Sequence, residues 1–187
     1  MTVLIGVSSL TNTNEYLLKI CAIGSGSVGK TSLIRRFAEN KFETNYLPTL
    51  GVDITTKKIE VNNSQVKLIL VDTAGQEFFG KLRPSYYRGA TACLIMFALT
   101  DKKSFEAIPT WLTEFTKYIP PTVPIALAGN KNDLVDERVV SEKDARKVAD
   151  ALNMSYYETS AKEGGSEITE IFHSLAKQVI EKDNISK

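Results

Sequence analysis

A glycine-rich run near the amino terminus limits what this chain can fold into more than any other feature. The run GSGSVGKT, residues 24–31, matches the phosphate-binding pattern G-x-x-x-x-G-K-[S/T], and it lies between an apolar, strand-like run and a helical pattern. Glycines let backbone N–H groups converge on phosphate oxygens, and the N-terminus of a helix favours anions. We expect this loop to hold the phosphates of a nucleoside triphosphate through Gly26, Ser27, Val28, Gly29, Lys30, Thr31 and Ser32.

Apolar, strand-like runs alternate with helical patterns along the chain. The expected strands are residues 16–23, 52–61, 66–71, 92–99, 123–128 and 155–158. The expected helices are residues 31–40, 104–118, 141–152 and 166–180. This alternation predicts an α/β fold with a six-stranded, mostly parallel sheet, one antiparallel edge strand and helices on both faces. We expect one domain, residues 16–182, between a flexible extension, residues 1–15, and a short tail, residues 183–187.

Oxygen-bearing side chains suited to Mg²⁺ lie near predicted strand ends. Asp72 follows the run at 66–71, and Thr49 lies in the segment before the run at 52–61. Mg²⁺ prefers oxygen ligands, and a strand-end aspartate can hold it directly or through water. We therefore predict a metal site formed by Thr31, Thr49 and Asp72.

Residues suited to hydrolysis of a γ-phosphate follow Asp72 in the run DTAGQE, residues 72–77. The Gly75 N–H can approach the γ-phosphate, and Gln76 can orient a water in line with it. Lys30 places a cation on the β- and γ-phosphates, and Thr49 can add its N–H there. We predict Gln76, Lys30 and Thr49 as the catalytic residues. No arginine lies between Lys41 and Ile54, so this loop offers no arginine finger in cis.

Two further loops distinguish guanine from adenine. In Asn130-Lys131-Asn132-Asp133, the Asp133 carboxylate can accept from the N1–H and the exocyclic amine of guanine, which adenine does not offer there. Asn130 can tie this loop to the phosphate loop, and the stem of Lys131 can lie along the base.

The second loop, TSAK at residues 159–162, follows the last predicted strand. The Ala161 N–H can donate to guanine O6, with Ser160 and Lys162 completing the loop, and Phe42 can pack against the base from the first connection. Together these motifs predict a guanine-nucleotide site with Mg²⁺ as cofactor and GTP or GDP as ligand.

Charge and composition bear on partners and compartment. The formal net charge of +1 gives no reason to expect nucleic acid as a partner. Cys21 and Cys93 lie in apolar runs and fit a reducing compartment. No apolar run is long enough to span a bilayer, residue 2 is not glycine, and the last four residues contain no cysteine for prenylation. We expect a cytoplasmic monomer, with peripheral membrane association only through partners or a missing C-terminus.

With these motifs in this order, residues 16–180 resemble the small GTPases of the Ras superfamily, and the Rab branch in particular. The Rab-like runs are LGVD, residues 50–53, and SYYRGA, residues 85–90. The resemblance implies the small G domain of the P-loop NTPases, slow GTP hydrolysis, an exchange factor and a GTPase-activating protein. It also implies effectors that contact two switch segments, residues 43–53 and 75–88, in membrane traffic or signalling. If the chain behaves as Ras does, intrinsic hydrolysis proceeds at about 10⁻⁴ to 10⁻³ per second.

Two positions differ from the usual Rab pattern. Ile54 stands where phenylalanine is usual, and Val71 stands where tryptophan is usual, so the usual Rab effector surface does not carry over to this chain at these residues. Two alternatives to a cycling switch remain at this point. One is an adaptor that holds GTP as a structural ligand without hydrolysing it, and the other is a small-molecule phosphotransferase. A single-turnover assay separates the first alternative from a GTPase.

Overall fold

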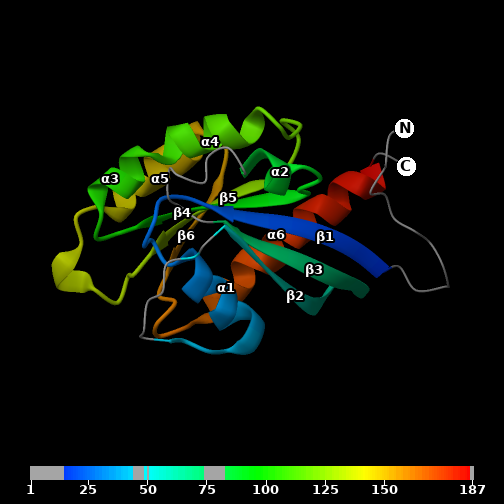
Figure 1. The fold of residues 1–187 in the computed structure, drawn as a ribbon, viewed down its shortest axis with the longest axis horizontal. Helices are drawn as coiled ribbons and strands as arrows, with labels where there is room; N and C mark the ends of the chain where they lie inside the picture. The colour runs from blue at the N-terminus through cyan, green and yellow to red at the C-terminus, as the bar shows by residue number, and fades with distance from the viewer. Residues whose placement is uncertain (1–14, 44–48, 50, 74–82, 186–187) are drawn as a thin grey trace.

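One six-stranded sheet with the order β2-β3-β1-β4-β5-β6 forms the centre of the molecule (Figure 1). The computed structural model describes residues 15–43, 49, 51–73 and 83–185. The strands are β1 (Glu15–Ile23), β2 (Val52–Val61), β3 (Ser64–Thr73), β4 (Ala92–Ala98), β5 (Ile125–Asn130) and β6 (Ser155–Thr159). Only β2 runs antiparallel to its neighbour, β3, and the other pairings are parallel. The predicted sheet is confirmed.

A two-residue turn makes β2 and β3 a hairpin. Asn62 and Asn63 have φ values of 51° and 60°, in the left-handed region that asparagine tolerates better than most residues. Two such residues at the centre of a turn match the right-handed twist of a hairpin. The turn fixes the register, in which Val61 lies opposite Ser64 and Asp53 lies opposite Asp72.

The predicted helices over residues 31–40, 141–152 and 166–180 are confirmed, and the fourth needs a correction. The helices are α1 (Lys30–Glu39), α2 (Arg83–Tyr87), α3 (Lys102–Glu106), α4 (Ile108–Thr116), α5 (Glu142–Ala151) and α6 (Ser166–Ile185), with a 3₁₀ turn, η2 (Val135–Glu137). The single helix predicted over residues 104–118 is wrong. The structure has α3 and α4 there, and Pro109 lies in the first turn of α4. Proline lacks the N–H that would continue the helical hydrogen bonds, so the helix restarts at this point.

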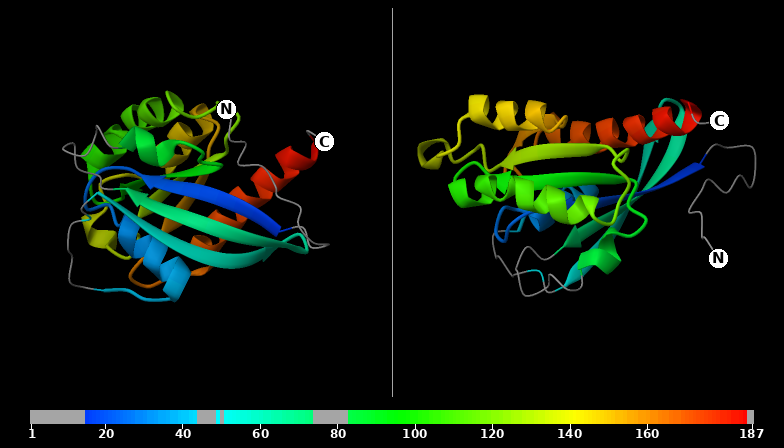
Figure 2. Two further views of the ribbon diagram at one scale, coloured as in Figure 1. Left: turned by 45° about the vertical axis from the view of Figure 1, so that its right-hand side comes forward. Right: turned by 90° about the horizontal axis from the view of Figure 1, so that it is seen from above.

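Alternate residues of the central strands feed two separate cores. In β4, Leu94 and Met96 pack with α1 and α6 on one face, whereas Ile95 and Phe97 pack with α4 and α5 on the other. All seven residues of β4 are buried, as expected for a parallel strand covered on both faces. Figures 1 and 2 show α1 on one side of the sheet and α4 on the other.

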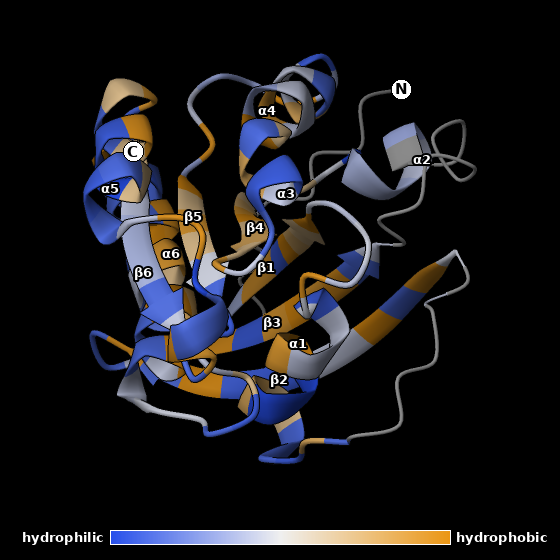
Figure 3. Ribbon diagram, turned by 90° about the vertical axis from the view of Figure 1, so that its left-hand side faces the viewer, coloured by the Kyte–Doolittle hydropathy of each residue, from blue (hydrophilic) through white to orange (hydrophobic). Residues whose placement is uncertain are grey.

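The carboxyl ends of the parallel strands meet at one edge of the sheet. Figure 3 views the molecule from this edge, with the hydrophobic strands between the helices. In open α/β sheets a ligand binds outside this edge, where neighbouring connections leave in opposite directions. Here that point is the end of β1, between β3 and β4. Among the described helices, none combines the length and the apolar character needed to cross a membrane.

Candidate functional site: a nucleotide site at the carboxyl edge of the sheet

The loop between β1 and α1 needs glycine at two positions for its own packing. Gly24 has a φ of +139°, and a Cβ there would lie 2.1 Å from the carbonyl oxygen of Met96. Gly29 has a φ of +94°, and a Cβ there would lie 2.2 Å from Asn130 Nδ2. Gly26 differs, because a Cβ on it would meet nothing within 4 Å among the described residues. Packing against the described residues therefore does not explain why position 26 lacks a side chain. Space kept open on the loop for a ligand does explain it.

The N-terminus of α1 is arranged to receive an anion. Its N-cap, Gly29, makes no side-chain capping hydrogen bond, and the first turn contains no acidic residue. Lys30 is 6% exposed, and its Nζ donates to the carbonyl oxygens of Gly24 at 2.9 Å and Ser25 at 2.8 Å. The loop thus wraps around a buried ammonium group beside the N–H groups of the first helical turn, and both attract phosphate. Ser27, Val28, Thr31 and Ser32 follow within the same loop and the start of α1.

The three predicted metal ligands lie together. The Thr31 hydroxyl donates to Asp72 Oδ2. The Thr49 hydroxyl oxygen lies 2.7 Å from the Thr31 hydroxyl oxygen and 3.3 Å from the same Asp72 oxygen. Asp72 is 2% exposed, and its Oδ1 has no hydrogen-bond partner within the described residues. Burial raises the pKa of the Asp72 carboxyl, against the hydrogen bond from Thr31 and the charge of Lys30. An all-oxygen set with a buried carboxylate atom left unsatisfied fits a hard cation such as Mg²⁺.

Asn130 joins the loops that follow β1, β5 and β6. Its Nδ2 donates to the Val28 carbonyl oxygen at 2.9 Å, and its Oδ1 accepts from Thr159 Oγ1 and the Ala161 N–H, each at 3.1 Å. The side chain is 2% exposed, so these bonds are shielded from water. Asn130 therefore ties the phosphate loop to the predicted base loops. In the structure the Ala161 N–H is engaged by Asn130, and a bound base would share this donor.

The remaining predicted base-site residues occupy these same two loops. The Asp133 side chain is 7% exposed, and its Oδ2 lies 4.0 Å from Nζ of Lys162, which is largely exposed. Lys131 adopts a φ of 70°, which turns the chain immediately after β5. Ser160 is buried, and its hydroxyl oxygen accepts from the Glu163 N–H. This hydrogen bond shapes the loop and is not a contact with the base.

The predicted roles of three further site residues, Phe42, Gly75 and Gln76, stay predictions. Phe42 is half-buried and packs against the core on the α1 and α6 face, with Arg36 Cζ 6.0 Å from its ring centroid. Gly75 and Gln76 lie outside the described residues, so their predicted roles stay predictions.

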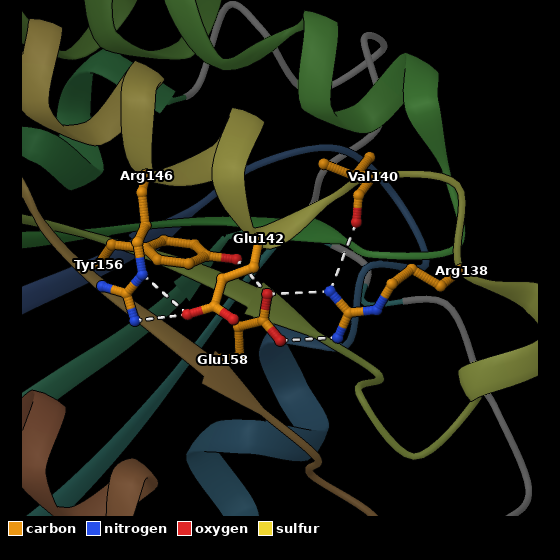
Figure 4. Close-up of polar contacts among 6 residues, drawn as sticks. All are labelled: Arg138, Val140, Glu142, Arg146, Tyr156 and Glu158. Carbon is orange, nitrogen blue, oxygen red and sulfur yellow. Dashed lines mark hydrogen bonds and ion pairs between the residues drawn. The ribbon is translucent and has the colours of Figure 1, made fainter.

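Sequence reasoning missed a polar cluster that supports the end of β6 (Figure 4). The Arg138 guanidinium donates to both carboxylate oxygens of Glu158, at 2.9 and 2.6 Å, and the Tyr156 hydroxyl donates to Glu158 Oε1 at 2.8 Å. Burial would raise the pKa of Glu158, but the hydrogen bonds from Arg138 and Tyr156 hold it below its usual value. Glu158 directly precedes the TSAK loop, so this cluster braces the strand that carries that loop. No sequence pattern identifies partners 20 residues apart on different elements.

Arg138→Met is expected to destabilise the fold by about 1–3 kcal/mol, because it leaves a largely buried carboxylate without its cation. Glu158 has a lowered pKa when folded, so its contribution is present at neutral pH and is lost as the pH falls through that folded-state value. Urea unfolding at neutral and acid pH should show a smaller loss of stability on acidification in the variant than in the wild type. Lys177→Met, which removes an exposed partner of Glu181 on α6, is the control and should retain the wild-type acid dependence. An equal acid dependence in Arg138→Met would contradict this role.

Trp111 contacts the phosphate loop, which its place in a helical pattern did not predict. It is 8% exposed, and its Nε1 lies 3.4 Å from the Ser25 hydroxyl oxygen. The indole of α4 therefore borders the loop that would hold the phosphates, and it is the single tryptophan of the chain.

The glycine-rich loop closes around a buried lysine at the carboxyl edge of a six-stranded sheet with a single antiparallel pair and helices on both faces. This is the architecture of the small G domain of the P-loop NTPases. The sequence profile of the Ras family matches residues 19–181. The chain belongs to this family and is a Rab-like small GTPase.

Curated relatives agree with the family match and cover most of the chain. Identity is 40% over 162 residues to human Ras-related protein Rab-22A, spanning 87% of this chain and 83% of that protein. It is 43% over 169 residues to Ras-related protein Rab-1 of Theileria annulata, spanning 90% and 76%. It is 39% over 168 residues to GTP-binding protein ypt1 of Schizosaccharomyces pombe, spanning 90% and 82%.

Proposed function

We propose that this protein is a molecular switch that binds GTP and GDP with Mg²⁺ and hydrolyses GTP slowly to GDP and phosphate. The observation that carries the proposal is the convergence of the Thr31 and Thr49 hydroxyls on the buried Asp72 carboxylate, next to the Lys30 loop. Thr49 belongs to the segment between α1 and β2, whereas Thr31 begins the phosphate-binding helix. The contact between these two hydroxyls supports one shared cation site formed by both segments.

Each group has a role in this proposal. The N–H groups at the start of α1 and the Lys30 ammonium would bind the phosphates. Thr31, Thr49 and Asp72 would hold Mg²⁺, which would supply positive charge next to the phosphates. Asp133 and the Ala161 N–H select guanine. Gln76 orients the attacking water. The arrangement positions and stabilises charge, which is what phosphoryl transfer requires of a protein.

Gln76→Leu is expected to slow single-turnover release of phosphate from bound GTP by at least tenfold and to leave GTP affinity unchanged, because leucine cannot orient a water. Single-turnover phosphate release, measured beside the affinity for a fluorescent GTP analogue, checks both parts. A wild-type protein that binds GTP but releases no phosphate would support the adaptor alternative instead. A parallel loss of binding and hydrolysis in the variant would show that Gln76 is structural.

We also propose that regulators and effectors follow the family pattern. An exchange factor would load GTP, a GTPase-activating protein would supply the arginine that residues 41–54 lack, and effectors would contact residues 43–53 and 75–88. The Rab-named relatives support a role in membrane traffic, with association at the membrane surface through partners. Ile54, one of the two residues that depart from the usual Rab pattern, is 60% exposed on β2 and is therefore available to an effector.

A further inference from the structure

Arg36 occupies a position between three parts of the molecule that sequence reasoning did not connect. It lies in the last turn of α1, whose C-cap is Asn40, and Asn40 donates its N–H to the Arg36 carbonyl oxygen at 3.0 Å. Its guanidinium leaves α1 and reaches the loop after β6. Nε donates to the Ala161 carbonyl oxygen at 3.0 Å, and Nη2 donates to the Lys162 carbonyl oxygen at 2.7 Å.

The third nitrogen of the guanidinium holds the chain as it leaves α1. Nη1 lies 3.2 Å from the carbonyl oxygen and 3.4 Å from Oδ1 of Asn40, and the guanidinium carbon lies 6.0 Å from the Phe42 ring centroid. The planar guanidinium thus bonds both the loop at residues 159–162, called the base loop below, and the start of the segment that leads to Thr49. Lysine cannot reproduce this, because a single ammonium group does not present a fixed planar fork.

The bonds to Ala161 and Lys162 fix the peptide units of the loop that contains the guanine O6 donor. Asn130 accepts from the Ala161 N–H on one side, and Arg36 donates to the Ala161 carbonyl oxygen on the other. Asn130 therefore holds the peptide unit that carries the Ala161 N–H, and Arg36 holds the next peptide unit, which carries the Ala161 carbonyl, so Arg36 constrains the N–H through the backbone of this one residue. Charged donors make stronger hydrogen bonds than neutral ones, so Arg36 contributes a large share of this constraint.

We propose that Arg36 is a positioning residue that aims the Ala161 N–H at the base and thereby sets how long a guanine nucleotide stays bound. This inference rests on the proposed function. Because the same guanidinium bonds Asn40 and lies against Phe42, a partner that pulls residues 40–43 away from α1 also releases the base loop.

Arg36→Met tests the proposal, with Lys147→Met as the control. Lys147 is an exposed cation of α5 that pairs with Asp144 at 3.7 Å, and α5 packs on the opposite face of the sheet from α1. Release of a fluorescent GDP from the Mg²⁺-bound protein should be about tenfold faster in Arg36→Met and near the wild-type rate in Lys147→Met. Arg36→Lys, which keeps the stem and the charge and so guards against a folding defect, should also release GDP faster than the wild type.

Base analogues separate positioning from general loosening. 6-Thio-GDP replaces O6 with sulfur, a weaker acceptor, whereas IDP keeps O6 and lacks the exocyclic amine that Asp133 would accept from. Arg36→Met should reduce the preference for GDP over 6-thio-GDP and preserve the preference for GDP over IDP, because Asp133 lies on a different loop. An unchanged GDP release rate, or an equal loss of both preferences, would overturn the inference. A wild-type protein without guanine preference would overturn the proposed function as well, so the two failures are distinguishable.

Discussion

Lys30→Ala is expected to weaken binding of both GDP and GTP by about 10²–10⁴-fold, since bonds between a charged donor and phosphate oxygens contribute about 1.5–3 kcal/mol each. Lys30 is buried, and its ammonium already lies inside the loop, bonded to the Gly24 and Ser25 carbonyl oxygens. The group is therefore placed before a ligand arrives, and its removal cannot be compensated by water in an equivalent position.

The measurement for Lys30→Ala is the rise in thermal midpoint that saturating Mg²⁺–GDP produces. A ligand that binds only the folded state stabilises it by RT ln(1 + [L]/Kd), where [L] is the free ligand concentration. At the same ligand concentration the rise should therefore be much smaller in Lys30→Ala than in the wild type. Lys147→Ala, which removes an exposed lysine of α5, is the control and should keep the full rise. An equal rise in Lys30→Ala would refute the phosphate assignment.

Asp133→Asn is expected to change which base the protein prefers. The Asp133 carboxylate is almost fully buried, so a base that cannot donate to it leaves a charged acceptor without its partner. Asparagine presents an amide donor, which suits the C2 oxygen of xanthine and not the amine of guanine. The expected result is a loss of about 10²–10⁴-fold in GDP affinity together with a gain in affinity for XDP.

Competition of GDP and XDP for the wild-type and variant proteins measures this shift directly. Asp136→Asn, an exposed change in the η2 turn, is the control and should keep the wild-type order. If Asp133→Asn lost affinity for every nucleotide equally, the residue would be structural. If the Asp133→Asn variant kept the preference for GDP, the assignment of Asp133 to the base site would be wrong.

The sheet was predictable because its signals are local and repeated. Burial on both faces makes β4 apolar throughout, and Asn62-Asn63 is a local turn signal, so neither needs knowledge of distant contacts. The break between α3 and α4 was missed because Ile108, Trp111 and Phe115 continue the apolar spacing of one helix, and only the backbone effect of Pro109 interrupts it. Periodicity reports which face is buried and does not report a lost hydrogen bond.

The candidate site was predictable where its chemistry resides in a short motif. Lys30, Thr31, Thr49 and Asp72 are brought together as the motif order and the parallel sheet require. The residues that hold these loops in place were not predictable, because Arg36 and Arg138 act through contacts across 125 and 20 residues of sequence. Arginines in helical or loop patterns carry no local signal of such a partner.

The central claim is that the described site selects guanine nucleotides. The most direct test is a titration of nucleotide-stripped, Mg²⁺-supplied protein with fluorescent GDP and, separately, with the matching ADP derivative. Because the buried Asp133 carboxylate can accept hydrogen bonds from guanine and not from adenine, we expect GDP to bind at least about 10³-fold more tightly than ADP. Equal affinities, or tighter binding of ADP, would contradict the assignment of Asp133 and Ala161 to the base and with it the proposed GTPase switch.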